Sequence, residues 1–130
     1  ISFDGDYTAN IKSINYEGIV INRIMIDESK TTVWFHFKNI TLKNIAIGVH
    51  PPGDKRAFFI ISKDRSSKFL LTGVNDIPIE PKTITISPGD TYDFSLTFER
   101  LTTRDFHILE GEVVDVGATP WNFLNIHLNE

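Results

Sequence analysis

The chain has 130 residues, of which 41% are hydrophobic, with ten Phe and no Cys. This length fits one domain, and the apolar content excludes a disordered chain, because large buried side chains offset the entropy lost on folding. The net charge of −4 gives no basic footprint for nucleic acid, and the lack of Cys excludes disulfides and thiolate chemistry. No apolar run approaches the roughly 20 residues of a membrane-spanning helix.

The first 17 residues are polar and irregular, with Asp4-Gly5-Asp6 near their start. We predict a tail or linker over residues 1–17 and a single domain over residues 18–130. Because residue 1 is Ile and not Met, we expect a processed or excised form, which leaves room for an export signal or a neighbouring domain in the full-length chain.

Apolar and polar residues alternate from Gly18 onward, as they do in half-buried strands. Between Ile21 and Ile24 the apolar parity changes, which predicts a β-bulge near residues 22–23. Residues 73–81 are predicted to form a loop. The predicted strands cover residues 19–27, 33–38, 45–49, 58–62, 68–72, 83–87, 91–99, 106–110 and 123–129.

These short strands, separated by turn residues at intervals of about ten, predict an all-β, single-domain antiparallel β-sandwich of about 8–9 strands. No window keeps the apolar stripe of a helix. The predicted core contains the inward residues of the clearest strands: Phe35, Phe37, Ile60, Phe94, Leu96, Phe98 and Ile126.

Two tryptophans are the candidate ligand-binding residues. Exposed indoles stack on sugar rings and form hot spots at protein interfaces. Trp34 has outward parity beside Phe35, and Trp121 is followed by Asn122, a polar side chain suited to a ligand hydroxyl. The alternative is that both indoles only cover a sheet face or edge.

Histidines and carboxylates give no catalytic pattern. His36, His50, His107 and His127 form no His-x-His or His-x-x-x-His pair, so we predict no metal and no cofactor. Glu110 could act as a general acid, but a carboxylate beside a strand-ending Gly is more simply a surface or loop-anchoring group. No nucleophile elbow, phosphate loop or dinucleotide fingerprint is present, so we predict no enzyme.

The order of several phrases resembles a β-sandwich module of exported Bacteroidetes proteins. The phrases are Trp34-Phe35-His36-Phe37, Pro51-Pro52-Gly53, Phe59-Ile60-Ile61, Pro88-Gly89, Phe94-Ser95-Leu96-Thr97-Phe98, Phe106-His107-Ile108-Leu109-Glu110-Gly111 and Trp121-Asn122-Phe123 with Ile126. The resemblance implies an extracytoplasmic, immunoglobulin-like accessory domain and carries over no catalytic residue.

The function predicted first is therefore a non-catalytic extracytoplasmic module that binds another protein or serves as a scaffold or spacer in a cell-envelope protein. The alternative is a carbohydrate-binding module that uses an exposed Trp, with a glycan as its partner. A metal-binding or enzyme-associated domain is the third hypothesis.

Overall fold

The structure, a computed structural model, describes residues 4–113, 115 and 119–129. Within these residues it has ten strands and no helix, which confirms the all-β prediction. It follows that this part of the chain contains no helix long and apolar enough to cross a membrane.

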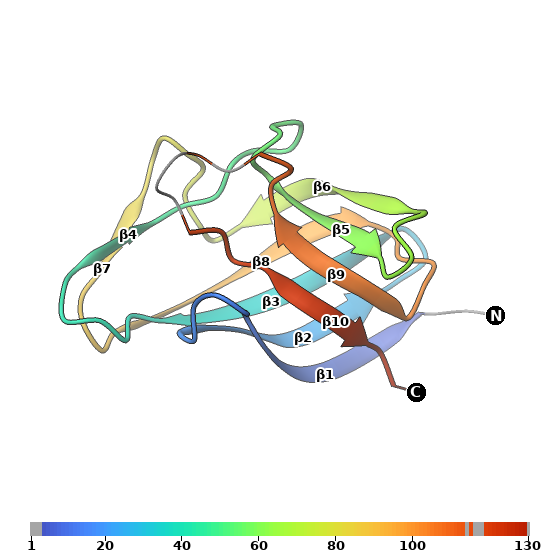
Figure 1. Ribbon diagram of the computed structural model, residues 1–130, viewed down its shortest axis with the longest axis horizontal. Coiled ribbons are helices and arrows are strands. Elements are labelled where there is room, and N and C mark those ends of the chain that lie inside the picture. Colours follow the sequence, from blue (N-terminus) through green and yellow to red (C-terminus); the bar gives the residue numbers. More distant parts are fainter. Residues whose placement is uncertain (1–3, 114, 116–118, 130) are drawn as a thin grey trace.

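Eight of the strands form one antiparallel sheet in the order β1-β2-β3-β8-β6-β5-β9-β10 (Figure 1). A separate two-stranded ribbon joins β4 to β7. The bounds are β1 Gly5–Lys12, β2 Ile19–Ile26, β3 Lys30–Lys38, β4 Ile45–Ile47, β5 Phe58–Ser62, β6 Lys68–Asn75, β7 Ile84–Ile86, β8 Thr91–Glu99, β9 Asp105–Glu110 and β10 Phe123–His127.

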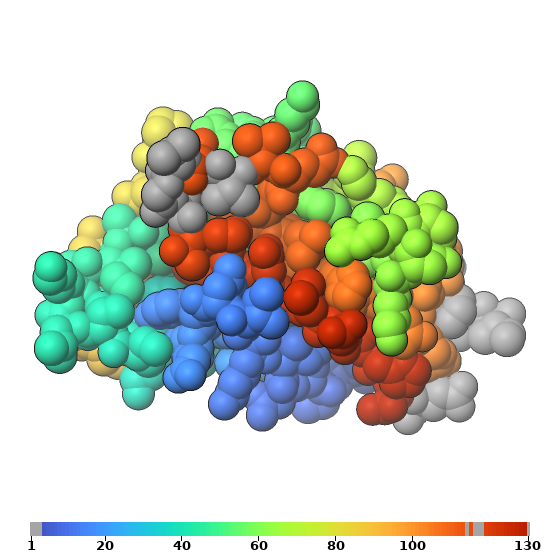
Figure 2. Space-filling model, in the orientation of Figure 1, coloured from blue at the N-terminus to red at the C-terminus, as the bar shows by residue number. Residues whose placement is uncertain are grey.

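The sheet curls into a nearly closed barrel. Strand β6 pairs with β5 near Phe69 and with β8 near Val74. It therefore joins two layers of the sheet, one made of β1, β2, β3 and β8 and the other of β5, β9 and β10. At the far edges the Ile14 N–H donates to the Asn122 carbonyl at 2.9 Å. Figure 2 shows these N-terminal and C-terminal segments, blue and red, side by side. The two edges diverge toward the chain ends and leave a cleft of about 640 Å³.

Aromatic rings fill the interior and join the two layers. Phe35 on β3 stacks on Phe94 of β8 with ring centroids 5.0 Å apart, and it meets Phe58 of β5 and Phe123 of β10 at 5.7 Å each. All seven predicted core residues are buried, none more than 3% exposed, which confirms the inward parity assigned from sequence.

Several strand boundaries also match their predictions. Strands β5 and β8 have the predicted bounds, and the register of β2 against β3 shifts between Ile21 and Arg23, where the bulge was expected. The loop prediction over residues 73–81 is wrong at its start, because β6 continues to Asn75. Residues 73–75 stay extended since they pair with Ser95, Leu96 and Thr97 of β8.

The prediction of an irregular tail is also wrong over residues 5–12, which form β1 and pair with β2; residues 1–3 lie outside the described part. The signal was a weak alternation, in which Tyr7, Ala9 and Ile11 are only half-buried. Across this pair Arg23 donates to both carboxylate oxygens of Asp6, at 2.7 and 2.8 Å.

The β4–β7 ribbon is fixed to the barrel by a buried amide. The Asn39 side chain donates to the Lys43 carbonyl at 2.7 Å and to the Ile86 carbonyl at 2.9 Å, and its oxygen accepts from the Thr41 N–H at 2.9 Å. A buried amide with its hydrogen bonds made holds one geometry. The ribbon therefore stands at a defined distance from the barrel end and forms one wall of the candidate site.

Candidate functional site

A pocket of about 570 Å³ is lined by residues of β4, by the end of β9 and by the segment that leads into β10. This volume falls within the range usual for small-molecule sites. Its walls combine apolar side chains from β4 and the prolines at 51, 81 and 120 with a set of polar groups and one indole. The polar and aromatic lining is His50, Asp54, Arg56, Glu80, Glu110, Asp115, Thr119 and Trp121.

Glu110, the last residue of β9, is a partly buried carboxyl of this lining. Its Oε1 accepts from the Trp121 N–H at 2.7 Å, and its own N–H donates to Asn122 Oδ1 at 3.0 Å. Burial raises the pKa of Glu110 to about 7; the Trp121 hydrogen bond opposes the rise and the Glu80 carboxylate adds to it. Near neutral pH this carboxyl is therefore present in both protonation states.

Glu80 reaches the same pocket from the loop between β6 and β7. Its N–H donates to the Val49 carbonyl at 2.8 Å, and Val49 donates in turn to Pro78 at 3.0 Å. This close approach depends on Gly48, because a Cβ there would lie 2.7 Å from the Lys82 carbonyl oxygen and 3.3 Å from Glu80 Oε1. The peptide bond between Glu80 and Pro81 is cis.

Arg56 also lines the pocket and is held by two carboxylates. It makes a two-pronged contact with Asp54, at 3.1 Å for both Nε–Oδ1 and Nη2–Oδ2, and its Nη1 lies 3.4 Å from Asp115 Oδ2. The hydrogen bonds from Arg56 lower the pKa of Asp54 to about 2. The guanidinium charge is thus already balanced within the site. His50 lines the pocket near Asp54 and makes no hydrogen bond with any residue described.

Trp121 supplies the aromatic wall. Its ring packs on the core rings of Phe37, at a centroid distance of 5.4 Å, and Phe94, at 6.4 Å, and the residue lines the pocket. Because its ring rests on the core, the indole is a preorganised surface for a flat apolar ligand face.

The two other sequence candidates lie elsewhere. Trp34 is on the outer face of β3, where the Arg23 guanidinium covers its ring at 4.3 Å from the centroid. Asn122 is close to the pocket but its groups are used in the fold: its side-chain oxygen holds Glu110 N–H and its N–H donates to Asn15. The two indoles are therefore not brought together, and Trp121 is the one that lines a pocket.

The four histidines stay apart. His36 pairs with Asp93 at 2.5 Å and His127 with Asp105 at 2.6 Å, both at the surface. His107 is buried and accepts from the Asn125 N–H, and burial, together with Arg65 and Lys63, lowers its pKa. In the described residues no three His, Asp or Glu side chains are placed to share a metal ion.

Gly111 sets the chain direction immediately after Glu110. Its φ is +88°, and an added Cβ would lie 2.8 Å from the Val113 carbonyl oxygen and 3.0 Å from Arg56 Cα. Two constraints therefore require glycine here: the left-handed backbone and the close passage of the Arg56 main chain.

We expect Gly111→Ala to lower the free energy of unfolding by about 2–3 kcal/mol, as strained backbone positions with added contacts do. Gly53→Ala is the matched control, since Gly53 has φ of +90° and nothing within 4 Å of an added Cβ. Gly53→Ala should lower the free energy of unfolding by about 1–2 kcal/mol, which is the cost of the left-handed backbone conformation alone. Chemical denaturation measures both. Equal losses would contradict the close approach at Arg56.

Comparison of the chain with protein-family models, with curated proteins and with solved structures gave no match. The resemblance to a Bacteroidetes module therefore stays a prediction.

Sequence reasoning found Trp121 and considered Glu110, but it missed Glu80, Arg56 and His50 as neighbours. The loop-anchoring role expected for Glu110 is confirmed by its bond to the Trp121 N–H. Pro-rich turns on both sides, at residues 51–53 and 78–81, were a signal that two rigid loops converge here.

Proposed function

We propose that this chain is a non-catalytic carbohydrate-binding module whose sugar stacks on Trp121 in the pocket between β9, β10 and the β4–β7 ribbon. The observation that carries this is one indole backed by core rings and bordered by the Glu80 and Glu110 carboxyls. A sugar ring offers an apolar face for the indole and hydroxyl donors for the carboxyl oxygens. An exported setting and an immunoglobulin-like affiliation belong to this proposal, while the protein-interaction or spacer role stays a prediction without assigned residues.

One observation favours a second candidate, glycoside hydrolysis. The raised pKa of Glu110, about 7, beside a second carboxyl is the pattern of a general acid and its partner. We place it second because Glu110 Oε1 is already bound to the Trp121 N–H and Arg56 is balanced by Asp54 and Asp115. A hydrolytic site also needs free donors for the charge that develops in the transition state.

The test is a panel of immobilised and soluble glycans, with affinities measured by calorimetry. We expect at least one glycan to bind, and we expect Trp121→Ala to weaken it about 30-fold or more, the loss typical of a hot-spot aromatic. Trp34→Ala is the control, because its ring is covered by Arg23, and it should leave the affinity unchanged. Binding that survives in Trp121→Ala, or binding by no glycan of the panel, would overturn the proposal.

Two further measurements complete this test. Since Trp121 packs on Phe37 and Phe94, its truncation also lowers stability, so Trp121→Phe should keep the fold and most of the binding. Trp34→Phe leaves Trp121 as the single indole, and a bound sugar should then change its fluorescence. Release of reducing ends from the bound glycan, lost in Glu110→Gln, would move hydrolysis to first place.

A further inference from the structure

We infer that the sugar bound in this pocket carries a free amino group, whose ammonium docks between the Glu80 and Glu110 carboxylates beside the Trp121 indole. This inference rests on the proposed function and names the ligand class within it.

The charges that line the pocket favour a positively charged ligand group. Arg56 is balanced by Asp54 and Asp115, so this guanidinium has no charge to spare for the glutamates. Neither Glu80 nor Glu110 forms an ion pair with any residue that the structure describes. Two carboxylates in one pocket, without a cation of their own, repel each other and attract a positive ligand group.

The hydrogen-bond acceptors of the pocket suit an ammonium group. Oε1 of Glu110 is used by the Trp121 N–H. No fully buried side-chain oxygen of the described residues lacks a partner, so the second oxygen of this carboxyl is open to solvent from the pocket. An ammonium has three donors and no acceptor, which suits carboxylate oxygens on two sides.

The Trp121 indole also favours a cation. A cation within about 6 Å of an indole centroid is attracted by the negative ring face, and more so when water is partly excluded. A hydroxyl in the same position would gain only neutral hydrogen bonds, which are weaker than those to a charged donor. The pocket therefore favours an amine over an otherwise identical hydroxyl or acetamide.

A pH dependence follows from the groups that face Glu110. These are Glu80, His50, Asp54, Arg56 and Asp115, which line the same pocket. As pH falls through 7, Glu110 takes up a proton, and the loss of its negative charge weakens the attraction for an ammonium. Amine binding should strengthen from pH 5.5 to neutral, until the sugar amine itself loses its proton.

The experiment uses three β-1,4-linked trisaccharides that differ only at carbon 2: glucosamine, N-acetylglucosamine and glucose. Calorimetry at pH 5.5 and 7.0 gives their affinities for the whole chain. We expect the glucosamine trisaccharide to bind at least tenfold more tightly than the other two at pH 7.0, with a smaller preference at pH 5.5.

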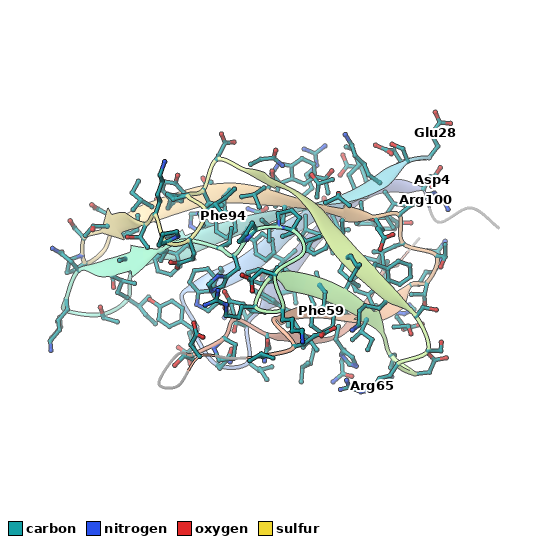
Figure 3. The ribbon with its side chains drawn as sticks, turned by 90° about the horizontal axis from the view of Figure 1, so that it is seen from above. Asp4, Glu28, Phe59, Arg65, Phe94 and Arg100 are labelled. Carbon is teal, nitrogen blue, oxygen red and sulfur yellow. The ribbon has the colours of Figure 1, made fainter. Side chains whose placement is uncertain are left out.

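Glu80→Gln and Glu110→Gln should each weaken glucosamine binding by about 10- to 100-fold, the loss of one hydrogen bond to a charged group, and should weaken glucose binding by a smaller factor, because a hydroxyl makes only a neutral hydrogen bond with either side chain. Glu28→Gln is the control, because it removes one negative charge at the exposed β2–β3 turn, at the far end of the molecule in Figure 3. An equal loss in that variant would show a general charge effect and overturn the assigned contacts.

The remaining outcomes separate this inference from the proposed function. Equal binding of the three trisaccharides, or tighter binding of the neutral ones, would overturn the amine selectivity and leave a sugar-binding pocket. Binding by none of them would also overturn it, and the glycan panel then decides separately whether the chain binds carbohydrate. An amine preference that persists in both Gln variants would show that Glu80 and Glu110 do not bind the ammonium.

Discussion

Replacement of Phe35 by Ala is expected to lower the free energy of unfolding by about 3–5 kcal/mol, the usual range for a buried aromatic. The ring contacts Phe94 beside it and Phe58 and Phe123 from the opposite layer, so its loss opens a cavity where β3, β8, β5 and β10 meet. Denaturation in guanidinium chloride measures the loss.

Leu70→Ala is the matched control for this prediction. Leu70 is a large apolar residue of the same sheet but is 52% exposed, so its truncation should cost less than about 1 kcal/mol. Similar midpoints for the two variants would contradict the barrel interior described above.

Glu110→Gln is expected to stabilise the protein at pH 8 by up to about 3 kcal/mol, the free energy that corresponds to a pKa raised from 4.5 to about 7. Between these pH values the native state holds a proton that the unfolded chain has released. Wild-type stability therefore falls as pH rises through this window, while Gln does not titrate and can still accept from the Trp121 N–H.

The measurement is a series of denaturation curves from pH 4 to 8. The difference between variant and wild type should be small at pH 4, where Glu110 is protonated in both states, and should reach its full size above pH 7. Glu28→Gln at the exposed turn controls for the removal of one charge. A difference that is constant with pH would show that Glu110 is not buried as described.

The features of the fold that could be predicted from the sequence are those with a pattern among neighbouring residues. Strand β8 was predicted with its observed bounds because four apolar residues alternate behind a Pro-Gly turn, and the bulge in β2 followed from a change of parity. Strand β1 was missed because its inward side chains are only half-buried, so its alternation competes with the Asp-Gly-Asp turn signal. Such a strand exists through its pairing with β2, which no local pattern states.

The candidate site shows the same division. Trp121 could be chosen from residue type alone, because an indole near polar side chains is a frequent binding group. Glu80 could not, since it approaches Glu110 only because Gly48 admits the neighbouring loop and Asn39 fixes the ribbon. Those contacts join residues far apart in the chain, and a single sequence does not specify them.

The pairing of β3 with β8 has a kinetic consequence. It is an uninterrupted ladder of nine pairs from Lys30↔Glu99 to Lys38↔Thr91, so even its nearest partners are positions 38 and 91. The chain must close a long loop before this central ladder gains any free energy, whereas the β2–β3 hairpin forms locally. Topologies of this kind refold in milliseconds to seconds. During that time the apolar face of β3, with Phe35 and Phe37, is exposed because β8 has not yet paired with it. Exposed apolar surface promotes aggregation, so the refolding yield should fall as protein concentration rises.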